Sequence, residues 1–449
     1  MGRSRLGILG ALALTLAGRA GAAEITDIAS RGTGKPFDLR VTLTWDRFQE
    51  RAAITRETPS APDPATNPAG GILSGDELRY TRTMNTIVPK VAVGVTEDLE
   101  VHLAWPYVLG DDRTWRFGQT SSGPSGGDYP YHVSTIETND WNANGATCAA
   151  DADATIPGVQ CPLFPVAPDT TVYHGGRAGD LRAGIAWGIF DDKLDPTKPF
   201  WLVGLDVTFP TASRYDPIAG RDMSSLLWVS PHSAPGSPAP VGEKVWRWDL
   251  STALSKRMGP MDPYVKAHLT LVTKSSSTYS NCDHAAELAA RTNPEMNSNA
   301  VAGCGAQGSK ADARLPWIAG ITFGTELVPY ENAAEQQRVS LDFRLFGDYT
   351  SSQRFYNELT DANGKLNWTE DYLTMGGYFG LYLRASKFVS LQASASLSTT
   401  TAHWLTGEGM GNPAAPSPNF DWRYDSPGHR FRISEVENFT MSFAGVLTF

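Results

Sequence analysis

The chain of 449 residues carries 48 acidic against 38 basic side chains, which gives a formal net charge of −10. Binding to nucleic acid requires a basic surface, and this composition offers none, so no nucleic-acid partner is expected. After the N-terminal region, no apolar run approaches the roughly 20 residues that a bilayer-spanning helix needs. This excludes a helical membrane protein, and any membrane crossing must therefore be made by strands.

The N-terminus has the layout of a secretory signal peptide. Arg3 and Arg5 precede an apolar run over residues 6–17, and small residues continue to Ala23. This pattern predicts a signal peptide over residues 1–23, with cleavage after Ala22 or Ala23, followed by a single domain over residues 24–449. The mature chain is then exported through a cleaved signal peptide.

Alternation with a period of two runs through the rest of the chain and predicts about twelve β-strands. In each strand, aliphatic and aromatic residues occupy one face, and small, polar or charged residues occupy the other. The predicted strands lie at residues 37–48, up to 95, 99–107, 181–189, 201–209, 246–254, 265–271, 317–327, 339–345, 373–383, 389–397 and about 430–449.

The last predicted strand ends in F-T-M-S-F-A-G-V-L-T-F over residues 439–449, where large apolar residues share one face that is interrupted by Gly445. The last strand of a soluble sandwich is one interpretation. The segment also resembles the closing strand of a bacterial outer-membrane β-barrel, which implies that the barrel-assembly machinery recognises the strand ending at Phe449. A closed barrel requires this strand to pair antiparallel with the first strand, residues 37–48.

Long and short connections alternate strictly along the chain. Outer-membrane barrels have an even number of strands, short periplasmic turns and long external loops, whereas a sandwich has no reason to keep its long loops at one end. We therefore predict an all-β fold, a transmembrane antiparallel β-barrel of about twelve strands, integral to the outer membrane of a Gram-negative bacterium and surrounded by its lipid. Aromatic residues near strand ends are expected to form a girdle: Trp45, Trp105, Tyr107, Trp201, Trp246, Tyr264 and Tyr372.

Charged residues fall on the strand face that points away from lipid, where they avoid a cost of roughly 2–4 kcal/mol for Arg or Lys at the bilayer midplane. Acidic and basic side chains are interleaved, which fits either a water-filled channel for a solute or a network of paired charges that narrows the lumen. The histidines of this set lie on different hairpins, which disfavours a metal site, and no cofactor is expected. The candidate lumen-lining residues are Arg40, Asp46, Glu100, His102, Arg182, Asp206, Arg247, Asp249, Lys266, His268, Glu326, Arg338, Asp342, Arg344, Asp348 and Arg384.

The four cysteines, Cys148, Cys161, Cys282 and Cys304, lie in two irregular segments. Their spacing includes no C-x-x-C, which argues against metal binding and thioredoxin-like chemistry. Such thiols pair in an oxidising compartment, and three connectivities are possible. We favour Cys148–Cys161 and Cys282–Cys304, because each pair lies within one segment.

Residues 131–134, Y-H-V-S, resemble the histidine and serine arrangement of outer-membrane phospholipase A, which raises the possibility of a catalytic site. A nucleophilic serine requires a base held within hydrogen-bond reach. Here His132 and Ser134 lie in a long loop without a strand to hold them. The sequence therefore predicts no enzymatic activity.

A family resemblance is carried by three motifs. Residues 90–107 read K-V-A-V-G-V-T-E-D-L-E-V-H-L-A-W-P-Y, residues 179–182 read G-D-L-R, and residues 205–211 form an apolar strand that ends in P-T, with Ala212 in place of a glycine. They resemble hairpins of the outer-membrane family of phenol-degradation meta-pathway transporters, which is distantly related to the fatty-acid channel barrels. The resemblance covers about residues 77–212.

The resemblance implies a channel or transporter for passive passage of small solutes, aromatic or hydrophobic ones among them. The alternative is a non-conducting barrel whose loops bind partners or stabilise the envelope. The long loop before Gly176 is a candidate for folding into the lumen as a constriction.

Overall fold

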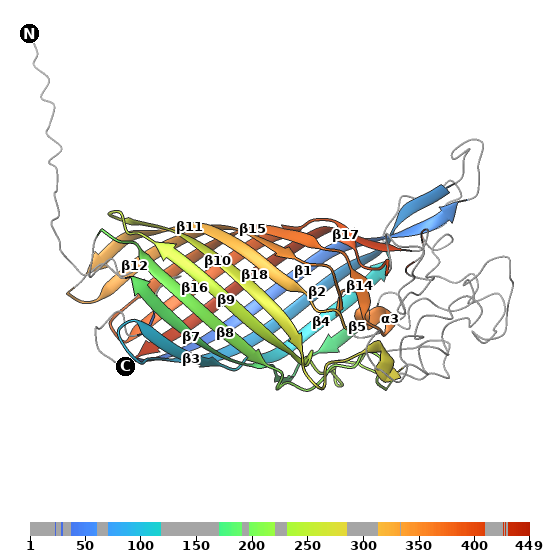
Figure 1. Cartoon of the computed structure of the whole chain (residues 1–449), viewed down its shortest axis with the longest axis horizontal. Helices are drawn as coiled ribbons and strands as arrows, with labels where there is room; N and C mark the ends of the chain where they lie inside the picture. Colours follow the sequence, from blue (N-terminus) through green and yellow to red (C-terminus); the bar gives the residue numbers. More distant parts are fainter. Residues whose placement is uncertain are drawn as a thin grey trace, which may run out of the picture.

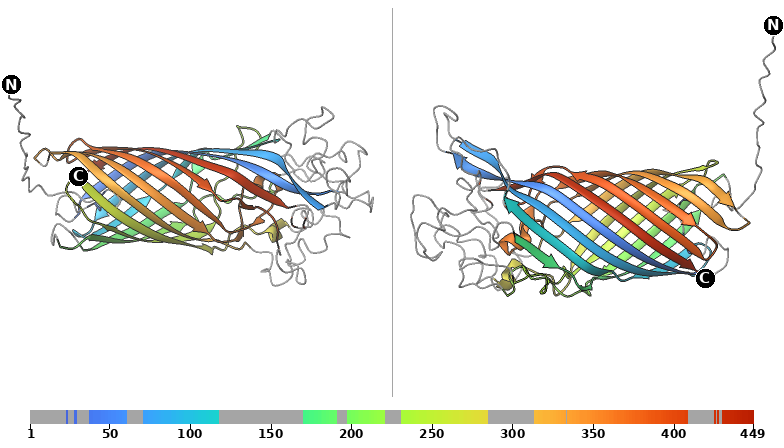
Figure 2. Two further views of the ribbon diagram at one scale, coloured as in Figure 1. Left: turned by 90° about the horizontal axis from the view of Figure 1, so that it is seen from above. Right: turned by 180° about the vertical axis from the view of Figure 1, so that it is seen from behind.

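The computed structural model of the chain is a closed antiparallel β-barrel (Figures 1 and 2). The structure describes residues 23, 28–29, 37–60, 71–117, 170–190, 197–220, 231–284, 313–332, 334–408, 425, 427 and 430–449. Within these residues, twelve wall strands form the ring, because β3 continues into β4 and β5 continues through β6 into β7. The predicted fold class and strand number are confirmed.

The wall is built from long strands and from short segments that extend them. The long strands are β1 (Leu39–Ser60), β2 (Gly71–Gly94), β7 (Leu181–Phe190), β8 (Phe200–Phe209), β9 (Val245–Ser255), β10 (Met261–Lys274), β11 (Trp317–Asn332), β12 (Gln337–Thr350), β15 (Tyr372–Arg384), β16 (Val389–Thr400) and β18 (Phe431–Thr448). The shorter ones are β3 (Leu99–Ala104), β4 (Tyr107–Phe117), β5 (Thr170–His174), β6 (Arg177–Ala178) and β17 (His403–Trp404). In the part of the chain that is described, no helix is long and apolar enough to cross a membrane.

The ring is closed by the first and last strands. β1 pairs antiparallel with β18 from Arg40 opposite Thr448 to Arg56 opposite Phe431, with one irregularity between Arg51 and Ala53. β1 also pairs with β2, so neither terminal strand leaves an unpaired edge. A closed ring satisfies every backbone group along the seam, which lipid requires. The predicted pairing of the closing strand is confirmed.

Large apolar side chains cover the outside of the wall, as the period of two predicts. They include Leu43, Leu103, Trp187, Leu250, Phe323, Leu345, Phe379, Leu397 and Phe443, all exposed. The prediction that Tyr264 and Tyr372 belong to the aromatic girdle is wrong. Tyr264 and Tyr372 alternate with outward residues and point inward, where Tyr264 is buried and Tyr372 stacks on His403.

Several strands extend further than the pattern predicted. β1 and β2 pair as far as Ser60 opposite Gly71, and their far ends project beyond the other strands (Figures 1 and 2). The third wall strand is divided between Ala104 and Tyr107, because the proline at position 106 cannot donate a ladder hydrogen bond. Its carbonyl still accepts from the amide of Gly179 at 2.8 Å, so the wall stays joined at the break.

One loop folds inward instead of outward. Residues 351–371, here called the inner loop, connect β12 to β15 and contain β13 (Gln353–Phe355), α3 (Thr360–Asn363) and β14 (Asn367–Thr369). α3 and β14 lie at the end of the barrel opposite the C-terminus (Figure 1). Most of the inner loop is buried, which the sequence did not lead us to expect of an external connection.

Candidate functional site

The predicted inward face carries side-chain bridges that span a middle strand. His102 on β3 reaches Asp206 on β8, with 2.5 Å between Nε2 and Oδ1, and its Nδ1 lies 3.1 Å from Glu100. β7 lies between these strands, and it has Gly184 at the crossing point. A Cβ on Gly184 would collide with both side chains, so the glycine makes the bridge possible.

A second bridge of the same kind lies four strands further around the ring, over β11. The Tyr264 hydroxyl on β10 donates to Asp342 on β12 at 2.5 Å, passing over Gly324 on β11. Arg344 donates from Nε to Asp342 at 2.7 Å and from Nη2 to the Tyr382 hydroxyl at 2.8 Å. Its guanidinium carbon is 4.1 Å from the centroid of the Tyr378 ring, within cation–π range.

Most of the other predicted lumen residues also pair with nearby groups. Buried Arg338 and Glu326 form an ion pair at 2.5 Å. The remaining contacts are Ser442 with Asp46, Thr270 with Asp249, Glu243 with Arg247, and Asp348 with His268. On the same faces, Arg182 is exposed, and Lys266 and Arg384 are half-buried. The inner face of the mid-barrel wall therefore carries acidic and basic side chains close to one another.

Two residues from the N-terminal segment lie against the inner wall near the end where the C-terminus lies. Ile28 and Ala29 are buried. The Ala29 amide donates to Glu100 at 2.7 Å, and Arg40 Nη2 lies 3.5 Å from the Ile28 carbonyl oxygen. The N-terminal segment thus uses two of the predicted lumen residues as partners.

At the opposite mouth, contacts of the inner loop converge on Asp361 of α3, which is fully buried. Its carboxylate accepts from Arg113 Nη1 on β4 at 2.8 Å and from the Tyr215 hydroxyl. His174 Nε2 on β5 lies 3.2 Å from both carboxylate oxygens. One side chain of the inner loop therefore binds two wall strands and the segment after β8.

The basic partner of Asp361 belongs to a larger cluster on the wall. Arg113 Nη2 also donates to Asp111 at 2.7 Å, and Asp111 receives a two-pronged contact from Arg82 on β2 at 2.6 and 2.9 Å. Such charge-assisted, bidentate contacts are stronger than neutral hydrogen bonds and fix orientation. The cluster holds Arg113 in place to receive Asp361.

The electrostatics of this contact favour the charged carboxylate. Burial alone would raise the pKa of Asp361, but His174 and Arg113 and the hydrogen bonds from His174 and Tyr215 hold this pKa well below its usual range. Asp361 therefore stays ionised at every physiological pH. Its contribution to holding the inner loop is present above its ordinary pKa and is lost in acid.

The inner loop crosses the mouth from one side of the ring to the other. Toward β4, Trp115 Nε1 donates to the Glu358 carbonyl at 2.9 Å. Toward η2 (Asn281–His284), which follows β10, Asn281 Nδ2 donates to the Leu366 carbonyl at 3.1 Å. Leu366 in turn donates its amide to Asn281 Oδ1 at 2.8 Å. The two anchors are separated in the ring by β7, β8 and β9.

Apolar side chains pack at both anchors. Leu359 and Ala362 join a buried cluster with residues of β1, β2, β4, β5 and β18, whereas Phe355 and Leu366 join a second cluster with residues of β9 and β10. Full burial of a leucine side chain contributes about 1.5–3 kcal/mol. The inner loop is thus held by apolar packing at two places and by the Asp361 contacts, which lie beside the first of them.

The contacts between the inner loop and the wall at this mouth were not predicted from the sequence. The alternation of Asp111 and Arg113 beyond the predicted end of the third strand was the available signal, but nothing local marks Asp361 as their partner. Other predictions lie outside the described residues: the signal peptide, the His132 and Ser134 pair, and the loop before Gly176 beyond its last residues. Cys148, Cys161 and Cys304 also lie outside them, so the disulfide pairing stays a prediction. Within the described residues, no group of three or more His, Cys, Asp or Glu side chains could hold a metal ion.

The fold of this chain is similar to several solved structures of outer-membrane proteins. The barrel is similar to an outer membrane channel from Pseudomonas putida F1 (TM-score 0.41, 11% identity, covering 91% of this chain and 95% of that chain). It is also similar to a FadL homologue of Pseudomonas aeruginosa (TM-score 0.33, 8% identity, 94% and 92%) and to the toluene transporter TodX of Pseudomonas putida (TM-score 0.29, 8% identity, 96% and 94%). No family model and no curated protein matches the chain. The fold is established by the chain's own ring of strands.

Proposed function

We propose that this barrel is an outer-membrane channel for passive passage of small solutes, and that the inner loop closes its external mouth in the state described here. The observation that carries the proposal is that the inner loop is not part of the strand ladder of the wall. The inner loop is bound to the wall by side chains, with Asp361 at their centre, and by a few backbone hydrogen bonds, those of Ser351 with Trp317, Arg354 with Arg314 and Glu370 with Trp404. Within the described residues, neither β13 nor β14 forms a ladder with a wall strand. A loop of this kind can leave the mouth while the wall stays intact.

The lining of the mid-barrel wall supports passage of solutes that carry both a ring and a polar group. Partly exposed Tyr378 offers an aromatic face beside the Arg344 guanidinium, and buried Tyr264 and Tyr382 contact the same guanidinium. Aromatic solutes with a carboxylate or hydroxyl group have the complementary chemistry. The lipid of the outer membrane and the barrel-assembly machinery, acting through β18, are the other partners that we propose.

The rival is a non-conducting barrel, and a specific observation favours it: most of the charges inside are already paired with each other. Single-channel recording in planar bilayers separates the two functions. We expect brief, infrequent openings of the wild-type barrel and longer or more frequent openings of Asp361→Ala, in which the central contact of the inner loop is removed.

Asp371→Ala is the matched control for this recording. Asp371 is exposed at the end of the same loop and accepts from the Tyr349 hydroxyl at 3.0 Å, outside the mouth contacts. It should open like the wild type. If neither the wild type nor Asp361→Ala carries current, although both migrate as folded barrels, the channel proposal is wrong and the non-conducting barrel stands.

The solute class is tested by liposome swelling with the Asp361→Ala barrel. Benzoate and cyclohexanecarboxylate carry the same charge and nearly the same size but differ in aromaticity. We expect faster entry of benzoate, and Tyr378→Leu should reduce this difference. Equal rates for the two solutes would remove the aromatic preference and leave the channel itself intact.

A further inference from the structure

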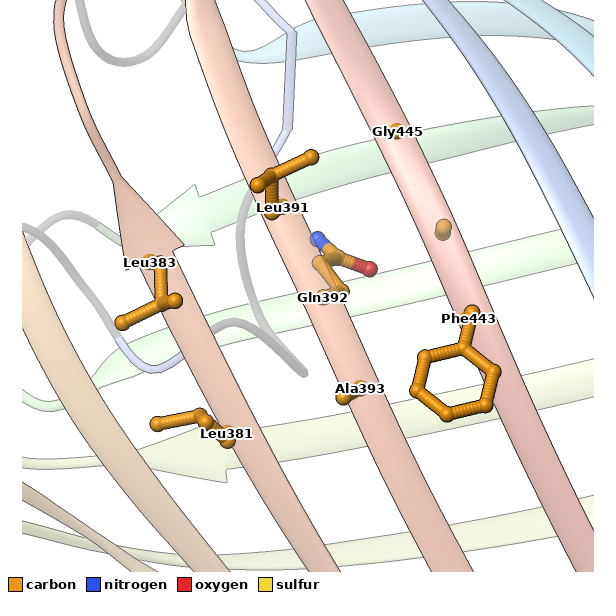
Figure 3. A pocket seen from close by; sticks show the side chains of 8 residues that line it. Leu381, Leu383, Leu391, Gln392, Ala393, Phe443 and Gly445 are labelled. Atoms are coloured by element: carbon orange, nitrogen blue, oxygen red, sulfur yellow. The ribbon is translucent and has the colours of Figure 1, made fainter.

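The outside of the wall carries a hollow where the apolar face of β18 is interrupted. Gly445 has no side chain, and a Cβ built on it would meet nothing within 4 Å. Gly445 pairs with Leu391, and the next outward pair along the same two strands is Phe443 with Ala393. The resulting hollow has a volume of about 410 Å³, and Figure 3 shows large side chains around its edge. It is lined mainly by Leu381, Leu383, Leu391, Ala393, Phe443 and Gly445.

The hollow faces lipid. The side chains of Leu391 and Phe443 on its edge are 54% and 49% exposed, and they belong to the apolar belt that surrounds the barrel. β15, β16 and β18 are paired residue by residue behind it, so the hollow has no passage into the lumen. An apolar hollow left empty loses dispersion contacts with its surroundings, whereas a flexible hydrocarbon chain restores them.

A basic side chain stands beyond one end of the hollow. Lys387 is exposed in the short turn between β15 and β16, and its Nζ lies 4.5 Å from the centroid of the exposed Phe388 ring. This turn lies beside the C-terminus, since the Thr448 amide donates to the Phe388 carbonyl at 2.9 Å, and it is four residues along the chain from Leu391. We expect this end of the barrel to be periplasmic, because its turns are short. At about 3.4 Å per residue, an extended strand covers that separation in roughly 14 Å. The headgroup layer on each side of the hydrocarbon core is roughly 5–8 Å thick, so Leu391 lies at the depth of the acyl chains when Lys387 is at the membrane surface.

We propose that the hollow binds one acyl chain of a phospholipid from the periplasmic leaflet, with Lys387 beside its phosphate. The three features required are apolar walls, a position in the lipid-facing belt and a cation at the membrane surface. A second copy of this chain fits the hollow poorly. A two-fold contact would set one hollow against another and leave more empty space between them.

Native mass spectrometry of the barrel, purified in detergent with added phosphatidylethanolamine or phosphatidylglycerol, tests the proposal. The wild type is expected to retain one bound phospholipid at detergent concentrations that remove the phospholipid from Gly445→Leu. The Cβ of a leucine at position 445 enters open space, and the rest of the side chain is expected to occupy the hollow. Ala393→Leu fills the same hollow from β16 and should also lose the lipid, which guards against a folding defect of a single variant.

Two controls make the result specific. Gly377→Leu adds the same side chain to an outward glycine of β15 outside the hollow, where a Cβ has ordinary contacts, and it should retain the lipid. Lys198→Ser removes a lysine that lies over Phe190 in another turn at this rim and should have no effect, whereas Lys387→Ser should lose the lipid.

Equal retention by the wild type, Gly445→Leu and Gly377→Leu would overturn the proposal. So would a lipid-free wild-type dimer that Gly445→Leu converts to a monomer, since a second copy would then occupy the hollow. Loss of lipid in Gly445→Leu with full retention in Lys387→Ser would overturn the assignment of Lys387 to the phosphate.

Discussion

The mid-barrel wall and the external mouth both contain buried charges, but they are assembled in different ways. In the wall, His102 meets Asp206 and Tyr264 meets Asp342 across a single intervening strand, so the register of the sheet sets each contact. At the mouth, Asp361 meets Arg113 of β4, a residue 248 positions away in the sequence. Asp361 lies in the inner loop, whose position is not set by the pairing of β4 with its neighbouring strands. The wall is therefore fixed by strand pairing, whereas the mouth depends on a few side-chain contacts that can be broken together.

The largest effect is expected from breaking the mouth. Asp361→Ala removes the carboxylate that Arg113, His174 and Tyr215 share and leaves Arg113 paired with Asp111 alone. Removal of one partner from a buried ion pair costs up to about 3–5 kcal/mol. Lys365 is 8% exposed on the inner loop, so trypsin should cut after it slowly in the wild type. Cleavage there should be faster by roughly 100-fold or more in Asp361→Ala, because cleavage follows the population of the open loop.

Asp371→Ala should be cut at the wild-type rate. Mass spectrometry of the released peptides identifies the site. Wild-type cleavage rates for Asp361→Ala would mean that apolar packing, and not Asp361, holds the inner loop.

A smaller effect, spread over the whole barrel, is expected from breaking the wall. The side chain introduced by Gly184→Val would collide with His102 and Asp206. Overpacking of this kind costs about 1–3 kcal/mol. Urea unfolding of the folded barrel in lipid vesicles, followed by tryptophan fluorescence, should show the loss.

Gly377→Val is the control for the wall, because a Cβ on this outward glycine lies 3.7 Å from its nearest neighbour. Trypsin cleavage after Lys365 should not change in Gly184→Val. A large increase would mean that the wall and the mouth are coupled.

The response of the mouth to pH is expected to be smaller still. The pKa of Asp361 is lowered in the closed state, so its contribution is complete above its ordinary value near 4 and declines as the pH falls below it. At pH 3 the loss should be about 1 kcal/mol. The open probability in planar bilayers should rise a few-fold between pH 5 and pH 3, and Asp361→Asn should lack this step. A rise of equal size in Asp361→Asn would assign it to another carboxylate.

The smallest effect is expected at an exposed ion pair near the same mouth. Arg79 Nη1 lies 3.0 Å from Glu435 Oε2, with the two side chains 42% and 73% exposed. Arg79→Ala should change the unfolding free energy by less than about 1 kcal/mol, and added salt should reduce even that difference. Urea unfolding at low and high salt measures it. A loss comparable with that of Gly184→Val would contradict the distinction between exposed and buried pairs.

The local pattern was sufficient for much of the wall. The period of two assigned Leu103 and Phe443 to the outside and His102 to the inside, because successive side chains of a strand point to opposite faces. The closure of a ring with an even number of strands placed β18 against β1. The alternation also assigns Tyr264 and Tyr372 to the inside, where Tyr264 binds Asp342 and Tyr372 stacks on His403. An aromatic residue near a strand end therefore belongs to the girdle only when the alternation also places it outside.

The sequence by itself determined the class of fold, the number of wall strands and the closing pair. The first two follow from side-chain alternation with a period of two, and the third follows from closure of a ring with an even number of strands. It did not determine where strands such as β1 and β4 end, because their outer parts are stabilised by packing on the inner loop. The tertiary structure decided the mouth and the lipid-facing hollow. Asp361 acquires its role from Arg113, His174 and Tyr215, and Gly445 acquires its role from side chains on β15 and β16, none of which is near in the sequence.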